Sequence, residues 1–165
     1  MAPVRADAHR SSARDFDFLL GRWRILNRWL DAEGRWHEFP STVTVTKHVD
    51  GLVLIDEYDI PDFPTRGNVT AINIRAFDDV TRQWQLVWLA SYCAPDMRPV
   101  IGAWKSEHEG EFLQSLDNGG GRTVQVRFRY LRRSDCDIRW EQAFSHDGGA
   151  TWAVNWTMKF KRAGA

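Results

Sequence analysis

The sequence has little of several features that would indicate a particular class of protein. Its two cysteines, Cys93 and Cys136, form no closely spaced pair, so neither a disulfide framework nor a zinc site is expected, and a cytoplasmic location is the default. No run of 18 apolar residues occurs and no apolar stretch follows the N-terminus, so neither a membrane span nor a secretory signal is predicted. The 22 basic residues equal the 22 acidic ones, which argues against nucleic acid or an anionic membrane as the main partner.

Short catalytic and metal-binding motifs are also missing. The five histidines form neither an H-x-H nor an HExxH pattern. The sequence contains no phosphate-binding glycine loop and no G-x-S-x-G nucleophile turn. We therefore expect no metal and no cofactor.

Aromatic residues are abundant instead. The 165 residues include nine tryptophans, nine phenylalanines and three tyrosines. Aromatic side chains favour half-buried strand surfaces, and each can bury about 150–250 Å². The length is that of one domain. Together these features predict an aromatic-rich β protein with either a large core or a lined cavity.

The chain divides into a predicted disordered tail over residues 1–11 and a single domain over residues 12–162. Ser12 and Asp15 form a weak capping box, and Gly21 lies where a glycine ends a helix, so a short N-terminal helix is predicted. Beyond it, short alternating segments separated by turn residues predict strands. These strands cover 22–30, 35–48, 51–60, 68–78, 83–92, 99–107, 111–117, 122–132, 136–145 and 152–162.

About ten sequential strands with short connections predict an antiparallel meander. An open sheet of that length would leave two exposed edges, whereas closure into an up-and-down barrel removes them. Barrels of eight or more strands can enclose a small ligand. The fold class is therefore predicted as all-β, an up-and-down barrel with the short helix capping one end. A two-sheet sandwich is the alternative.

Four segments strengthen the barrel interpretation. They are DFDFLLGRW at 15–23, NVTAINIRAFDDVTRQWQLVWLAS at 68–91, WEQAFSHDGGATW at 140–152 and NWTMKF at 155–160. Together they resemble a group of small bacterial lipocalin-like (calycin-type) proteins related to the domain of unknown function 1579. The resemblance implies a closed barrel with an internal pocket, in which Gly21-Arg22-Trp23 opens the first strand and the tryptophan closes the floor. Some related small barrels bind haem through one histidine, but no residue here matches it.

Two strands supply the predicted aromatic wall of that pocket. Trp84 and Trp88 share one face of strand 83–92, and Trp23, Asn27 and Trp29 share one face of strand 22–30. We expect both faces to point inward, where they would either stack a flat ligand or simply form the core. A buried Asn27 would be either a ligand contact or a core amide with all its hydrogen bonds made.

A carboxylate and a cation are predicted on neighbouring strands. Val53, Ile55 and Glu57 share one face of strand 51–60, and Arg75 lies on the next strand. An inward Glu57 would need a partner, and Arg75 is the obvious one. Such a pair could orient a polar ligand, or Glu57 could act as a general base with Arg75 stabilising an oxyanion. A solvated or structural ion pair is the alternative.

Residues Ser145–Trp152 match S-x-D-x-G-x-T-W at every fixed position and so resemble the Asp-box of sialidase propellers, a structural turn. A tight turn here would place Gln142 opposite Asn155, as a polar pair inside the barrel. A bulge would shift the register by one residue and place Trp140 opposite Trp156, with Met158 also lining the interior. The sequence leaves both registers open.

Three functions fit these patterns. The leading prediction is binding of a small apolar or aromatic molecule inside the barrel, by Trp23, Asn27, Trp29, Trp84, Trp88, Gln142, Asn155 and Trp156. The second is a cofactor-free enzyme (a cyclase, isomerase or lyase) acting on an aromatic or polyketide-like substrate through Glu57 and Arg75. The third is a structural barrel filled by its own tryptophans. Self-association as a homodimer through exposed strand faces is compatible with each.

Overall fold

The computed structural model describes residues 9–117 and 119–164. Its strands are β1 (Gly21–Leu30), β2 (Trp36–His48), β3 (Val53–Phe63), β4 (Gly67–Asp78), β5 (Gln83–Ala90), β6 (Val100–Trp104), β7 (Glu109–Asp117), β8 (Thr123–Ser134), β9 (Asp137–Ser145) and β10 (Ala153–Arg162). The ten predicted strands are therefore confirmed, with their ends shifted by a few residues. In the part of the chain that the structure describes, no helix has the length and apolar character needed to cross a membrane.

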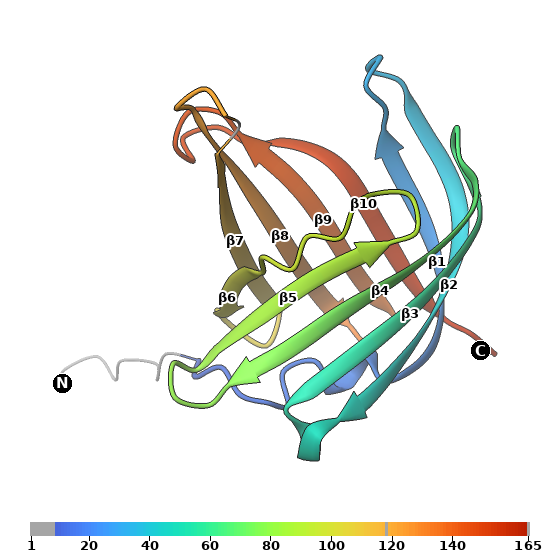
Figure 1. The fold of residues 1–165 in the computed structure, drawn as a ribbon. Coiled ribbons are helices and arrows are strands. Elements are labelled where there is room, and N and C mark those ends of the chain that lie inside the picture. Colours follow the sequence, from blue (N-terminus) through green and yellow to red (C-terminus); the bar gives the residue numbers. More distant parts are fainter. Residues whose placement is uncertain (1–8, 118, 165) are drawn as a thin grey trace, which may run out of the picture.

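The strands close into one antiparallel barrel. Each strand pairs with its neighbours in the chain, and β1 also pairs with β10, so the strand order is β1-β10-β9-β8-β7-β6-β5-β4-β3-β2 (Figure 1). The up-and-down barrel is thus confirmed and the sandwich is wrong. Alternation places one face inside: in β1, Trp23, Ile25 and Asn27 are buried, whereas Arg24 and Arg28 are exposed.

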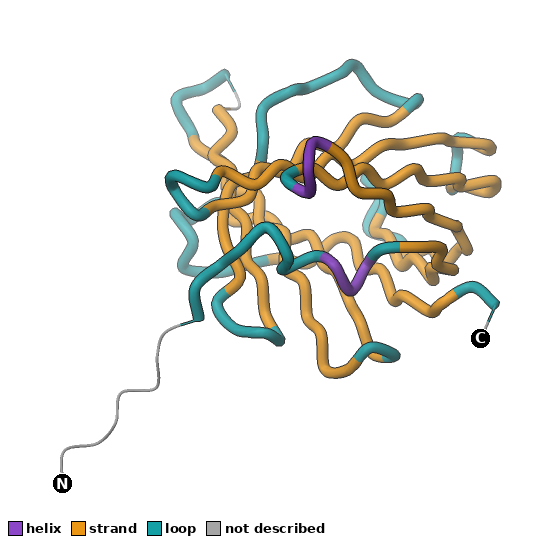
Figure 2. The backbone as a smooth tube through the Cα atoms, turned by 90° about the horizontal axis from the view of Figure 1, so that it is seen from below, coloured by secondary structure: helices purple, strands orange, loops and turns teal. Residues whose placement is uncertain are grey.

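The N-terminal segment closes one end of the barrel (Figure 2). The predicted helix is only a single 3₁₀ turn, η1 (Asp17–Leu19), because strand β1 already begins at Gly21 with a positive φ of 109°. The predicted capping contact does form, since the backbone N–H of Ser12 donates to Asp15 Oδ2 at 2.8 Å. Phe16 and Leu19 are fully buried and fill this end. A second 3₁₀ turn, η2 (Val49–Gly51), joins β2 to β3.

Most of the predicted tail, residues 1–8, lies outside the described residues. At Ser11 the structure differs from the prediction, because this residue is buried against the barrel. Its hydroxyl donates to Asp15 Oδ2 at 2.5 Å, and its carbonyl accepts from Arg82 Nη2 at 2.7 Å. The chain is therefore anchored one residue before the predicted domain start.

The wall of the barrel is weakest around the short strand β6. This strand pairs with β5 only over Trp84–Leu86, so within the described residues Val87–Ala90 has a ladder partner only in β4. The long connection over residues 91–99 runs back beside this half of β5 (Figure 1). On its other side β6 approaches β7 closely at Gly102, where a Cβ atom would lie 1.9 Å from the Glu111 carbonyl oxygen. Only glycine fits that position.

Candidate functional site

Side chains fill the barrel in three layers. The closed end is apolar and holds Phe16, Leu19, Trp23, Phe77, Trp84, Trp104 and Phe112. The middle is polar and holds Asp56, Tyr58, Asn73, Arg75 and Tyr130. The open end, where β1, β3, β5, β7 and β9 finish, contains a cavity with aromatic walls.

This aromatic cavity has a volume of about 150 Å³. It is lined by Trp29, Trp88, Tyr92, Phe128, Trp140, Gln142, Trp156 and Met158. Five of these side chains, those of Trp29, Trp88, Tyr92, Phe128 and Gln142, are half-buried, so the cavity is accessible from solvent. None of the lining residues is charged. The cavity is therefore a small, uncharged and mainly aromatic chamber with one carboxamide in its wall.

Contacts between the rings hold the cavity walls in place. Trp156 packs edge-to-face against Trp88 and Trp140, with ring centroids 5.8 Å apart in both pairs. Phe128 packs against Trp140 in the same way at 5.0 Å. Edge-to-face pairs of this kind stabilise by about 0.5–1.5 kcal/mol beyond simple burial. The rings are thus positioned by one another without a ligand.

Asn27 anchors one of these rings from behind. The indole N–H of Trp156 donates to Asn27 Oδ1 at 3.1 Å, and Asn27 Nδ2 donates to Ser41 Oγ at 2.8 Å. Asn27 is fully buried and does not border the cavity. Of its two predicted roles, the structure therefore shows the satisfied core amide and not the ligand contact.

The last hairpin takes a register that neither alternative described completely. The pairing of β9 with β10 shifts at Asn155, which is the extra residue of a bulge. Trp156 consequently lies opposite Gln142, and Met158 lies opposite Trp140. Gln142 still contacts Asn155, because its Nε2 donates to Asn155 Oδ1 at 3.1 Å. The bulge thus brings Gln142 and the two tryptophans into the same cavity wall, while Asn155 itself stays outside the lining.

The polar layer contains a fully buried ion pair between Arg75 and Asp56. Arg75 Nη2 also donates to the Tyr130 hydroxyl at 2.8 Å, and the Phe16 ring lies 4.7 Å from the guanidinium carbon. Burial raises the pKa of the Asp56 carboxyl, and Arg75 acts against that rise. Burial likewise opposes the charge of Arg75, but Asp56 and the neighbouring tyrosines raise the pKa of the guanidinium above its ordinary value. Since a guanidinium keeps its proton, Arg75 favours the ionised form of Asp56.

The predicted inward orientation of Glu57 is wrong. Glu57 is exposed on the outside of the barrel, where it pairs with Thr44 and Ile72 in the neighbouring strands. Strand β3 instead buries the set beginning at Leu54, which places the adjacent Asp56 inside, because a shift of one residue moves a strand's side chains to the other face. Arg75 is inward as predicted, but its partner is Asp56.

Two of the predicted wall tryptophans lie at the closed end of the barrel instead. The Trp23 indole donates to the Leu19 carbonyl at 2.7 Å, which agrees with its implied place in the floor. The Trp84 indole donates to Asp15 Oδ2 at 3.3 Å. Trp29 and Trp88 do line the cavity. Five residues were placed by the sequence on the inward faces of β1 and β5. Three of them, Trp23, Asn27 and Trp84, are fully buried, whereas Trp29 and Trp88 are half-buried at the cavity.

Two residues that line the cavity, Tyr92 and Phe128, were not predicted from the sequence. Tyr92 comes from the connection after β5, and the unusually apolar run Tyr92-Cys93-Ala94-Pro95 was the available signal. Phe128 comes from β8, where aromatic residues alternate with arginines and so share the inner face.

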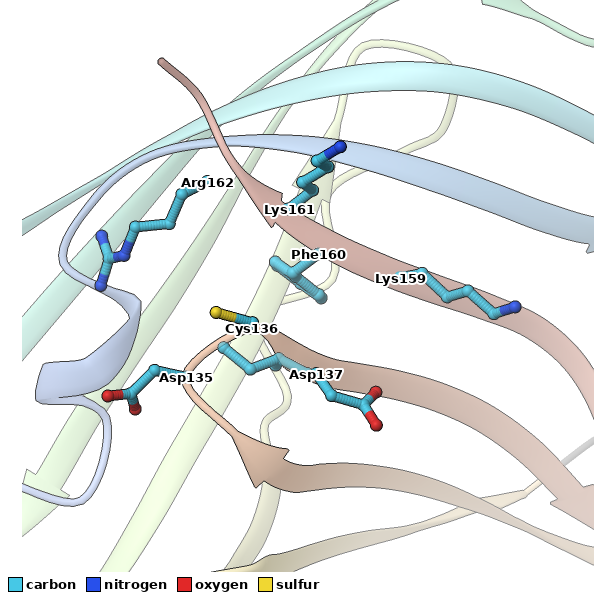
Figure 3. Close-up of a pocket in the computed structure, with 8 residues that line it drawn as sticks. Asp135, Cys136, Asp137, Lys159, Phe160, Lys161 and Arg162 are labelled. Atoms are coloured by element: carbon cyan, nitrogen blue, oxygen red, sulfur yellow. The ribbon is translucent and has the colours of Figure 1, made fainter. Parts of the chain in front are cut away.

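A larger surface groove lies at the closed end and, unlike the aromatic cavity, is lined mainly by charged residues (Figure 3). It has a volume of about 450 Å³ and is lined by residues 135–138 and 159–162. Arg162 at its edge is already engaged, since its two terminal nitrogens donate to the Leu20 and Phe18 carbonyls at 3.0 and 2.9 Å. Within residues 9–117 and 119–164, no cluster of three or more histidine, cysteine or acidic side chains could hold a metal ion.

Comparisons with known proteins identify the fold. No family model and no curated protein matches the chain significantly. Among solved structures, it is similar to Rv2717c from M. tuberculosis, with a TM-score of 0.61, 13% identity, and coverage of 94% of this chain and 99% of that one. It is also similar to the S-type phycobiliprotein lyase CPES from Guillardia theta, with a TM-score of 0.59, 11% identity and 91% coverage of each chain. At these identities the likeness shows a lipocalin-like barrel, and membership of the group related to domain 1579 stays a prediction.

Proposed function

We propose that this protein binds a small apolar or aromatic molecule in the aromatic cavity. The observation that carries the proposal is the composition of the cavity wall, in which six of the eight lining residues are aromatic and none is charged. An apolar cavity of about 150 Å³ is large enough for a benzene-sized molecule. The cavity therefore suits a ligand built on a single ring.

Binding is favoured over catalysis by the positions of the charged groups. The enzymatic alternative depended on Glu57 as a general base, and Glu57 lies on the outer surface. Asp56, the carboxylate that is inside, is engaged by Arg75 and does not line the cavity. A general base has to reach the proton that it removes, and none of the lining residues carries a carboxylate or an imidazole.

A titration with 4-fluorotoluene, followed by ¹⁹F NMR, tests the proposal. We expect saturable binding to the wild-type protein and binding about tenfold weaker in Trp88→Ala, because that substitution removes a ring of the wall. The matched control is Trp36→Ala, since Trp36 is 41% exposed on the outside of β2. Absence of saturable binding to the wild type, or an equal loss in both variants, would refute a ligand site in the cavity.

A further inference from the structure

Gln142 is the one lining residue of the aromatic cavity whose side chain is a carboxamide. Its hydrogen bonding indicates which ligands the cavity selects. We propose that the ligand is a neutral aromatic ring bearing a hydrogen-bond donor, a ring hydroxyl above all, which donates to Gln142 Oε1. This inference rests on the proposed function and adds the chemical class of the molecule that the cavity selects.

The carboxamide of Gln142 is held from one side only. Its Nε2 donates to Asn155 Oδ1 at 3.1 Å, and Asn155 is the bulged residue of β10. As the bulged residue, Asn155 has no ladder partner in β9, and its side chain accepts this hydrogen bond. The contact fixes the Gln142 carboxamide in the cavity wall. Among the described contacts, none engages Gln142 Oε1. Because Gln142 lines the cavity, this oxygen is an acceptor available to a ligand there, alongside the Tyr92 hydroxyl and the indole N–H groups of the wall.

The rest of the wall indicates which ligands would suit that acceptor. An ionised ligand would lose its hydration in a chamber that offers no opposite charge, and this loss is costly. Two of the four indole N–H groups already have partners, since Trp156 donates to Asn27 and Trp88 to the Tyr92 hydroxyl. A ring hydroxyl can donate to Gln142 and still accept a hydrogen bond, whereas a methyl group of similar size can do neither.

The test compares two ligands that differ only at this group. Binding of 4-fluorophenol and 4-fluorotoluene is measured by ¹⁹F NMR titration with the wild type and with Gln142→Met. We expect the substitution to weaken the phenol relative to the toluene by about threefold to tenfold, the range expected for one net hydrogen bond. The matched control is Gln85→Met, because Gln85 is exposed on the outer face of β5. This control is expected to leave the ratio of the two dissociation constants unchanged.

A second variant keeps the inference testable if Gln142→Met does not fold. Gln142→Glu retains an acceptor oxygen at a half-buried position, so we expect it to bind 4-fluorophenol at least as well as the wild type. An unchanged ratio in folded Gln142→Met, or loss of phenol binding in folded Gln142→Glu, overturns the inference while leaving the ligand site standing. If neither ligand binds the wild type, the proposed function fails and the inference fails with it.

Discussion

At the scale of single residues, the most consequential feature is the ion pair in the centre of the barrel. Arg75 and Asp56 both have 0% exposed side chains. Removing two charges from water is costly, and their attraction offsets that cost only while both partners are present. The Tyr130 hydroxyl, which accepts from Arg75 at 2.8 Å, contributes a further hydrogen bond. The pair therefore depends strongly on each of its members.

The first prediction concerns Arg75→Met. We expect this substitution to lower the free energy of unfolding by about 3–5 kcal/mol, because it leaves the Asp56 carboxyl buried without an opposite charge. The double variant Arg75→Met, Asp56→Leu should recover much of that loss, since it removes both charges. Urea unfolding measures both values. Lys105→Met is the control, because the Lys105 side chain is 56% exposed in its ion pair with Glu111 and its loss should matter little. A double variant as unstable as the single one would contradict this account.

The same pair shows why part of the site could not be predicted. In β3 both faces carry apolar residues, Val53 and Ile55 on one and Leu54 and Ile60 on the other. Either face could have been the inner one. The face chosen from the sequence placed Glu57 inside, whereas the structure places Asp56 there. In β4 and β5 the alternation is clearer, and the inward positions of Arg75, Trp84 and Trp88 were predicted correctly.

At the scale of elements, the Asp-box hairpin fixes the start of β10. Asp147 Oδ1 accepts from the Thr151 N–H at 2.9 Å, and Asp147 Oδ2 accepts from the Thr151 hydroxyl at 2.5 Å. The Ser145 hydroxyl also donates to Asp147 Oδ1 at 2.8 Å. These hydrogen bonds, those of Thr151 foremost, lower the pKa of the Asp147 carboxyl to about 2. The turn is therefore stabilised by the ionised carboxylate, as its sequence motif predicted.

This pKa gives the second prediction. The folded-state pKa of Asp147 lies below the ordinary value of about 3.9. Its contribution to stability is thus fully present above pH 4 and is lost as the pH falls towards 2. Asp147→Ala should therefore lower the melting temperature at pH 7 and have much less effect at pH 2. Thermal unfolding at both pH values measures this, with exposed Asp62→Ala as the control. An Asp147→Ala effect independent of pH would be inconsistent with the carboxylate's role.

Elements were more predictable than the way in which they pair. The ten strands followed from alternation and turn residues, both of which are local properties of the sequence. The bulge at Asn155 was weighed but not placed, because one extra residue in a strand leaves no local trace. The predicted helix contracted to one 3₁₀ turn because only three residues, Asp17–Leu19, lie between Phe16 and Leu20.

At the scale of the whole molecule, the barrel is closed unevenly. Strand β3 is paired along both sides, with β2 and with β4. In contrast, the second half of β5, Val87–Ala90, is paired with β4 on one side only. This half-strand leads into Tyr92 and includes Trp88, both of which line the aromatic cavity. The weakest part of the wall thus adjoins the site.

The third prediction is that amide hydrogen exchange is uneven in the same way. We expect amides in Val87–Ala90 to exchange faster than those in Leu54–Ile60, because segments with fewer strand partners open at lower free energy. Exchange followed by mass spectrometry compares both segments in one experiment, so β3 is the internal control. Equal protection of the two segments would show that the connection over residues 91–99 holds the wall as firmly as a strand.

The central claim, that the aromatic cavity is the ligand site, is tested most directly by a crystal structure with bromobenzene. Bromine is located by its anomalous scattering without any assumption about the pose of the ring. We predict an anomalous peak inside the cavity, among Trp88, Trp140 and Trp156. A peak only in the groove beside Ile138 and Phe160, or no peak within the barrel, would contradict the account.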